Sequence, residues 1–193
     1  MRARAVAVLT AALLVVGSTA GAAGAQEQVL RDPAGDMWAM DYAGNSTAAP
    51  QMRTGDVRRA AFRHRRSDVV VRQRFVDLRR VGRYTQHALR LQTGSNVFRE
   101  VVVVAGPGSW GGTVEVFNRR GRVDCEARHR IDYRRDTVLI RVPRSCLGDP
   151  TRVRASAAST WAQSRRDEFL VDNPHHTRAS VNRRTWTRWL RVG

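Results

Sequence analysis

The sequence predicts an all-β protein built as a single antiparallel β-sandwich of about eight to ten strands. Apolar and polar residues alternate at every second position through many short segments, which is the period of a half-buried strand. Clusters of turn residues, glycine above all, separate these segments. No segment of ten or more residues has the spacing of an amphipathic helix. Many short strands joined by turns are typical of a sandwich or a barrel.

The clearest pair of strands flanks a cysteine-containing corner within residues 136–159. Every second residue from Val138 to Val142 is aliphatic, which predicts a strand that ends at Pro143. The next residues, PRSCLGDP, contain two prolines and a glycine, so the connection is predicted to be tight. A second alternation begins at Val153, and two strands are therefore expected to flank the corner.

Shorter alternating segments predict the remaining strands. The predicted ranges are 56–64, 69–78, 87–92, 98–105, 113–118, 122–131 and 185–192. Residues 26–52 lack lasting periodicity and are predicted to form a structured loop or a sheet edge. The chain after Trp161 becomes polar, which predicts a long loop of the kind that often carries functional residues.

Residues 1–25 have the composition of a secretory signal peptide. Two arginines precede a mostly apolar run, and small residues ending in Ala-Gly-Ala follow, as expected of a cleavage site. The apolar run is too short to span a bilayer, and no later run is apolar enough to do so. We therefore expect a secreted mature domain of residues 26–193 without a membrane span.

Cys125 and Cys146 are the two cysteines of the chain. An even number of cysteines in an exported protein favours a disulfide over a metal site or a catalytic thiol. A pair of buried free thiols is the alternative. The bridge would join the start of one hairpin to the corner after Val142.

All 34 basic residues are arginine, and they outnumber the 17 acidic residues. A GC-rich genome can replace lysine by arginine, but it does not explain the excess of arginine over acids. Without Arg2 and Arg4 of the signal peptide the net charge is +15. A field of that sign attracts anionic polymers and surfaces. The chain has no specific nucleic-acid-binding motif.

Aspartates are concentrated near the start of the mature domain, around a Pro-Gly turn. They are Asp32, Asp36, Asp41 and Asp56. Calcium takes six to eight oxygen ligands, which such a loop can supply, and we expect a structural calcium site that includes Asp32, Asp36 and Asp56. Turn formation is the alternative, because aspartate side chains hydrogen-bond the backbone of their own turn.

Arginine pairs at positions i and i+2 predict a basic stripe on one face of the sandwich. The pairs are Arg72 with Arg74 and Arg152 with Arg154, and the turn 63–66 is expected to contribute. Two tryptophans near turns are candidate platforms for stacking a sugar ring or a base. They are Trp38 in the aspartate-rich loop and Trp110 between glycines.

The sequence contains few of the patterns that catalysis requires. There is no G-x-S-x-G motif, and the glycine-rich segment 106–112 lacks the residues of a phosphate-binding loop. The absence of lysine excludes Schiff-base chemistry, and the five histidines are scattered without metal-ligand spacing. Paired acids such as Asp167 and Glu168 leave a glycosidase as an alternative.

Several motifs together resemble a group of uncharacterised secreted actinobacterial β-sandwich proteins. They are DPAGD, Gly55-Asp56-Val57, Val76-Asp77-Leu78, the corner from Pro143 to Arg154, and the C-terminal W-T-R-W. This group is distantly similar to DOMON-like domains and family 9 carbohydrate-binding modules. The resemblance implies a jelly-roll-like sandwich, often with a structural calcium and sometimes with a sugar or haem ligand.

These observations lead us to expect a secreted, non-enzymatic domain that binds an anionic or carbohydrate polymer of the cell envelope. A small hydrolase that uses carboxylates of the aspartate-rich loop is one alternative, and a purely structural or interaction protein is another. Gathering of Trp38, Trp110 and acids in one cleft would favour the hydrolase. A flat basic face would favour polymer binding.

Overall fold

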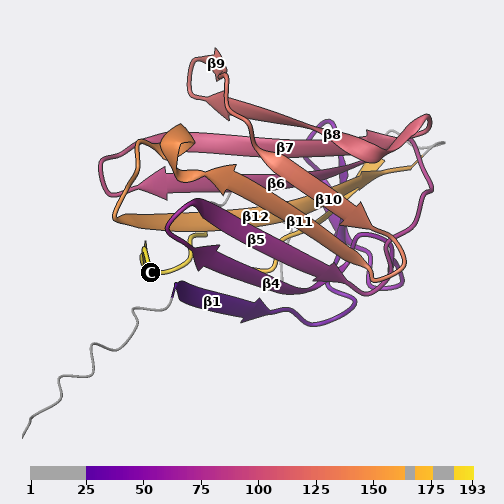
Figure 1. The fold of residues 1–193 in the computed structure, drawn as a ribbon. Helices are drawn as coiled ribbons and strands as arrows, with labels where there is room; N and C mark the ends of the chain where they lie inside the picture. Colours follow the sequence, from indigo (N-terminus) through magenta and orange to yellow (C-terminus); the bar gives the residue numbers. More distant parts are fainter. Residues whose placement is uncertain (1–24, 164–167, 176–184) are drawn as a thin grey trace, which may run out of the picture.

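The fold is described from a computed structural model, which places residues 25–163, 168–175 and 185–193 (Figure 1). The predicted signal peptide, apart from Ala25, and the acid Asp167 lie outside these residues. Within the described ranges, no helix has the length and apolar character needed to cross a membrane. The strands are β1 (Gln26–Arg31), β2 (Trp38–Asp41), β3 (Ser46–Ala48), β4 (Val57–His64), β5 (Asp68–Phe75), β6 (Tyr84–Thr93), β7 (Phe98–Gly106), β8 (Ser109–Asn118), β9 (Gly121–Arg122), β10 (Arg128–Asp132), β11 (Thr137–Pro143), β12 (Arg152–Ala162), β13 (Glu168–Asp172) and β14 (Leu190–Arg191).

Two antiparallel sheets pack face to face, which confirms the predicted all-β sandwich (Figure 1). The first sheet has the order β1-β4-β5-β11-β10. The second sheet has the order β3-β2-β13-β12-β6-β7-β8-β9, and β14 pairs with β12 beside this path. Consecutive strands β4 and β5, and likewise β6, β7 and β8, form antiparallel neighbours.

The core lies between the two sheets and is built by the alternation seen in the sequence. The first sheet contributes the buried aliphatic residues Val69, Val71, Val138, Ile140 and Val142. The second sheet contributes Leu89, Leu91, Val101, Val103, Val153, Ala155 and Ala157 to the same cluster. Complete burial of one such aliphatic side chain stabilises the fold by about 1.5–3 kcal/mol.

The predicted disulfide joins Cys125 to Cys146, with 5.7 Å between their Cα atoms. Cys146 lies in the short 3₁₀ helix η1 (Arg144–Leu147), and Gly148 ends this helix in the left-handed conformation with φ of 73°. Cys125 lies between β9, which belongs to the second sheet, and β10, which belongs to the first. The bridge therefore fixes the place where the chain crosses from one sheet to the other.

Residues 122–131 were expected to form one strand, and this prediction is wrong. β9 ends at Arg122, and β10 begins at Arg128. The five residues between them contain Cys125 and pass between the sheets, so they cannot continue either ladder.

Other predicted strands also differ from the structure, and β5 ends at Phe75 although a strand was expected over 69–78. Residues 26–52, expected to be a loop or an edge, contain the short strands β1, β2 and β3. β13 lies in the predicted long loop and pairs with β12 and β2. The strand expected over 185–192 is reduced to β14, and Trp186 and Trp189 stack on arginine side chains of β12.

His87 is enclosed in the core, with 0% of its surface exposed. Its ring lies edge-on to Phe75, with 5.3 Å between the ring centroids, and its Nδ1 lies 3.4 Å from the hydroxyl of Ser159. Burial disfavours the charged imidazolium and, with a smaller contribution from His129, lowers the pKa of His87 from 6.5 to about 3. Between about pH 6.5 and 3, His87 is therefore protonated in the unfolded chain but neutral in the folded protein.

We expect the Cys125→Ala/Cys146→Ala variant to be less stable than the parent by about 3 kcal/mol, because the bridge no longer restricts the unfolded chain. For a domain of this size the melting temperature should fall by roughly 6–12 °C. Thermal unfolding measures the difference, and thiol titration of the native parent is the control. Two reactive thiols in the native parent would contradict the bridge.

The pKa of His87 predicts that its own contribution to stability is lost in acid. Because the folded-state pKa lies below the unfolded value, this contribution should fall as the pH drops from about 6.5 toward 3, by about 2–3 kcal/mol at pH 4.5, whereas buried aspartates with raised pKa values act in the opposite direction. His87→Gln should remove most of this slope relative to the parent, whereas His129→Gln should leave most of it. Urea unfolding at several pH values tests both variants, and equal slopes for parent and His87→Gln would show that His87 is not responsible.

Candidate functional site

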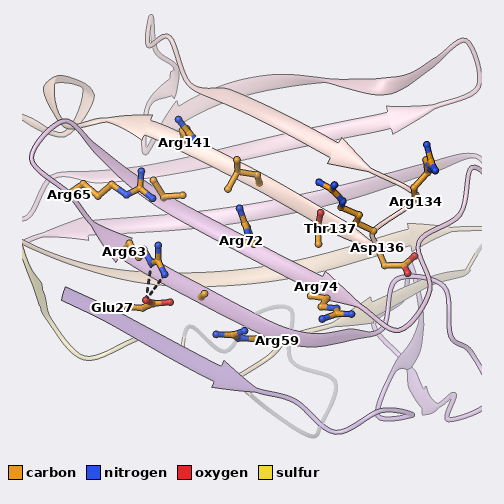
Figure 2. A pocket seen from close by; sticks show the side chains of 14 residues that line it. Glu27, Arg59, Arg63, Arg65, Arg72, Arg74, Arg134, Asp136, Thr137 and Arg141 are labelled. Carbon is orange, nitrogen blue, oxygen red and sulfur yellow. Dashed lines mark hydrogen bonds and ion pairs between the residues drawn. The ribbon is translucent and has the colours of Figure 1, made fainter. Parts of the chain in front are cut away.

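The outer face of the first sheet carries a lattice of arginines, which we call the arginine face. Because side chains alternate across a strand, the buried valines of β5 and β11 leave the intervening residues on this outer face. Its members on the strands are Arg31, Arg59, Arg63, Arg72, Arg74, Arg128, Arg130 and Arg141. Arg65, Arg134 and Arg135 extend it at the adjoining turns, and together with these strands they line a groove of about 600 Å³ (Figure 2).

The register places arginines of different strands directly beside one another. Arg59 of β4 is opposite Arg31 of β1 on one side and Arg74 of β5 on the other. Like charges at directly opposed positions of a sheet are destabilising. Repulsion between these arginines therefore reduces the stability of the first sheet. A surface of mixed charges would keep the protein soluble without this repulsion.

Few acids neutralise the arginine face. Glu27 forms an ion pair of 2.8 Å with Arg63, and Asp132 lies 3.5 Å from Arg130 (Figure 2 shows the former). Asp136 lies at the rim, where its side chain accepts a hydrogen bond from the backbone of Leu78. Among the residues that the structure describes, a set of exposed arginines has no ion-pair or hydrogen-bond partner. These are Arg59, Arg72, Arg74 and Arg141.

The predicted single stripe of Arg72, Arg74, Arg152 and Arg154 is wrong. Arg72 and Arg74 lie on β5 of the first sheet, whereas Arg152 and Arg154 lie on β12 of the second. The period of two identifies the face of a strand on which a residue lies, but not the sheet to which the strand belongs. Arg141, which has no neighbour at i+2, is part of the arginine face through its cross-strand partners.

Arg152 and Arg154 are engaged in a stack with two tryptophans. The guanidinium of Arg154 lies 5.0 Å from the ring centroid of Trp186 and 5.1 Å from that of Trp189. Arg152 lies 5.0 Å from Trp189, and Arg154 also donates two hydrogen bonds to Gln92. These contacts attach the C-terminal segment to β12, which is a structural role. Both tryptophans are half-buried and lie outside the core.

Trp38 and Trp110 lie far apart in the second sheet. Trp38 is on β2 and Trp110 is on β8, and four strands separate β2 from β8 in the sheet order. Both side chains are half-buried, and Trp110 meets Tyr133 edge-on with 6.3 Å between the ring centroids. The structure does not gather the two tryptophans in one cleft, which was the arrangement expected of the hydrolase alternative.

The aspartate cluster forms around three of the predicted residues and one that the sequence did not indicate. Suitably placed oxygens of Asp32, Asp36 and Asp172 all lie within 4.8 Å of one another. Asp56 is beside them, and its Oδ2 accepts a hydrogen bond of 2.8 Å from the backbone of Gly35. Asp41 is outside the cluster, where it accepts hydrogen bonds from Asn45. Asp172 ends β13, and no local pattern links it to residues 32–56.

Burial is the main cause that raises the pKa values of these aspartates. Desolvation, followed by the charge of Asp172, raises the pKa of Asp32 to about 9. Desolvation likewise raises the pKa of Asp172 to about 7 and raises the pKa values of Asp36 and Asp56. Four carboxyl groups held together in this way favour a bound proton or a bound cation over separate negative charges.

The fold and the surface define an all-β sandwich that carries a basic groove on one sheet. Comparisons with protein-family models, curated proteins and solved structures found no match for this chain. The similarity to DOMON-like and family 9 carbohydrate-binding domains stays a prediction from the sequence motifs.

The stack on β12 predicts different consequences for arginines of the two sheets. Arg154→Ala removes contacts with two indole rings and should destabilise the protein by about 1–2 kcal/mol. Arg72→Ala should change stability by no more than about 0.5 kcal/mol, because Arg72 is exposed and unpaired. Denaturant unfolding of the two variants tests this, and equal losses would mean that the stack contributes nothing to stability.

Proposed function

We propose that this protein is an exported, non-enzymatic binding domain whose arginine face holds an anionic polymer of the cell envelope. The observation that carries the proposal is the row Arg31, Arg59 and Arg74, three like charges side by side on neighbouring strands. An anionic ligand that binds between these guanidinium groups is attracted to each of them and compensates their mutual repulsion. The disulfide supports export, because such bridges persist in oxidising compartments.

The spacing of the arginine face favours a polymer over a single small anion. Neighbouring strands lie about 4.8 Å apart, and residues at i and i+2 lie about 6.8 Å apart along a strand. Arg72 and Arg74 therefore repeat along β5, while Arg59 and Arg141 extend the positive charge over the strands on either side. A chain with phosphate, sulfate or carboxylate groups in succession contacts several of these guanidinium groups at once. Each contact is weak alone, and their sum gives the affinity.

Arginine is suited to this role. Its planar guanidinium offers paired donors to phosphate or carboxylate and stays charged at all physiological pH values. The groove of about 600 Å³ leaves these donors accessible over four strands. The aliphatic residue Leu139 lies between Arg72 and Arg130 on neighbouring strands and provides contact for an apolar part of the polymer backbone.

Retention on immobilised anionic polymers across a salt gradient tests the proposed function. The mature domain should bind dextran sulfate and long-chain polyphosphate at low salt but not neutral dextran. The affinity should fall steeply as the salt concentration rises, because binding releases counterions from the polymer. Arg72→Glu/Arg74→Glu should elute at clearly lower salt and have a smaller salt dependence of affinity, because at least two contacts are lost. The domain should stay folded, since both residues are exposed.

The matched control is Arg119→Glu/Arg120→Glu, which makes the same change in net charge on the exposed turn between β8 and β9. This variant should elute close to the parent. If both variants shift equally, binding follows total charge and not the arginine face. If the parent is not retained at low salt, the proposed function is wrong.

A further inference from the structure

The aspartate cluster brings together carboxylates from separate parts of the chain. Asp32 follows β1, Asp36 precedes β2, and Asp172 ends β13. Their oxygens lie within 4.8 Å of one another. Asp56, just before β4, holds the turn between the first two through its hydrogen bond to the backbone of Gly35. Segments of both sheets therefore meet at this cluster.

Burial leaves several of these carboxylate oxygens without a donor. Asp32 is 7% exposed, Asp172 is 3% exposed and Asp56 is 1% exposed. Asp32 Oδ2, Asp56 Oδ1 and both oxygens of Asp36 are buried and accept no hydrogen bond from the described residues. A buried polar atom without a partner is costly, and a buried charge without a partner is costlier still.

Arginine does not compensate these carboxylates, although it is abundant in the chain. None of the arginines in the described ranges forms an ion pair with Asp32, Asp36, Asp56 or Asp172. The charges of Arg58 and Arg53 lower the pKa of Asp56, but burial raises it by more. The cluster thus excludes the available side-chain cations and leaves oxygen atoms directed at a common space.

We propose that Asp32, Asp36 and Asp172 are the ligands of one calcium ion, with Asp56 as a positioning residue. An all-oxygen set without histidine or cysteine selects a hard cation. Calcium binds oxygens at 2.3–2.6 Å, so ligands on opposite sides of the ion are about 4.6–5.2 Å apart, and magnesium requires a tighter octahedron with ligands at about 2.0–2.1 Å. Oxygens within 4.8 Å of one another can bind one ion, and because magnesium usually keeps several waters, a buried set of carboxylates favours calcium.

Calcium at this position would link the two sheets. Asp172 belongs to the second sheet, and its Oδ2 also accepts a hydrogen bond from the backbone N–H of Val57 in the first sheet. Asp32 extends β1, the edge strand of the first sheet. A cation that holds Asp32 and Asp172 together therefore closes this end of the sandwich, whereas the disulfide fixes the crossover near η1.

The test uses the mature protein, freed of metal with chelator and then titrated with calcium chloride or magnesium chloride. Calcium should raise the melting temperature, by roughly 5–10 °C at a concentration one hundred times the dissociation constant. Equilibrium dialysis should find one calcium per chain. A melting temperature that is the same in calcium and in chelator, or an equal response to magnesium, would overturn the proposal.

Two variants distinguish a bound calcium ion from a proton shared between the carboxyl groups. Asp36→Asn keeps the shape of the side chain but removes a charged ligand, so both the calcium response and the bound calcium should be lost. The control Asp41→Asn changes an aspartate outside the cluster and should respond like the parent. If Asp36→Asn stabilises the metal-free protein while the parent binds no calcium, the carboxyl groups share a proton and the calcium site does not exist. The parent titration decides the matter even if Asp36→Asn does not fold.

Discussion

The hydrophobic contact between the inner faces of the two sheets determines the positions of the other features. Val69 and Val71 of β5 and Val138, Ile140 and Val142 of β11 are buried against the second sheet. Because a strand exposes every second side chain on its other face, this burial directs the alternate residues outward. A shift of one residue in register would bury the arginines of β5 and expose the valines. The core therefore fixes the arginine face as firmly as it fixes the fold.

The crossover between the sheets is the second constraint. The chain leaves the second sheet after β9 and joins the first sheet at β10. Cys125 lies between these two strands and is bonded to Cys146 of η1. β11 follows and contributes Arg141 to the arginine face. The bridge thus holds the short edge strand β10 and its neighbour β11 in place beside β5, although β10 has only five residues.

Sequence reasoning could predict the features that depend on local periodicity. The alternation around Val138 and Val153 identified β11, β12 and the corner between them, and the cysteine count identified the disulfide. The partners of each strand could not be predicted, because the period of two says nothing about which strands pair. For this reason the sequence pattern groups Arg152 and Arg154 with Arg72 and Arg74, and it does not indicate Arg141. The order of the strands in the two sheets was the missing information.

The aspartate cluster illustrates the same limit over a longer distance. Asp32, Asp36 and Asp56 are close in the sequence, and their concentration around a turn was visible. Asp172 reaches them only because β13 is placed between β12 and β2 by backbone pairing. A short strand of five residues in a polar segment gives too weak a periodic signal to be recognised. The fourth carboxylate was therefore beyond prediction from the sequence.

The composition of the arginine face gives it an unusual chemical constancy. Since no lysine occurs in the chain, the face presents no primary amine. Acetylation and amine-directed cross-linkers neutralise lysine-rich surfaces, but they find no side-chain amine here. A guanidinium also keeps its proton in any alkaline medium that a folded protein survives. The positive charge of this surface is therefore set by the covalent structure of the chain and does not vary with the surroundings in which the protein works.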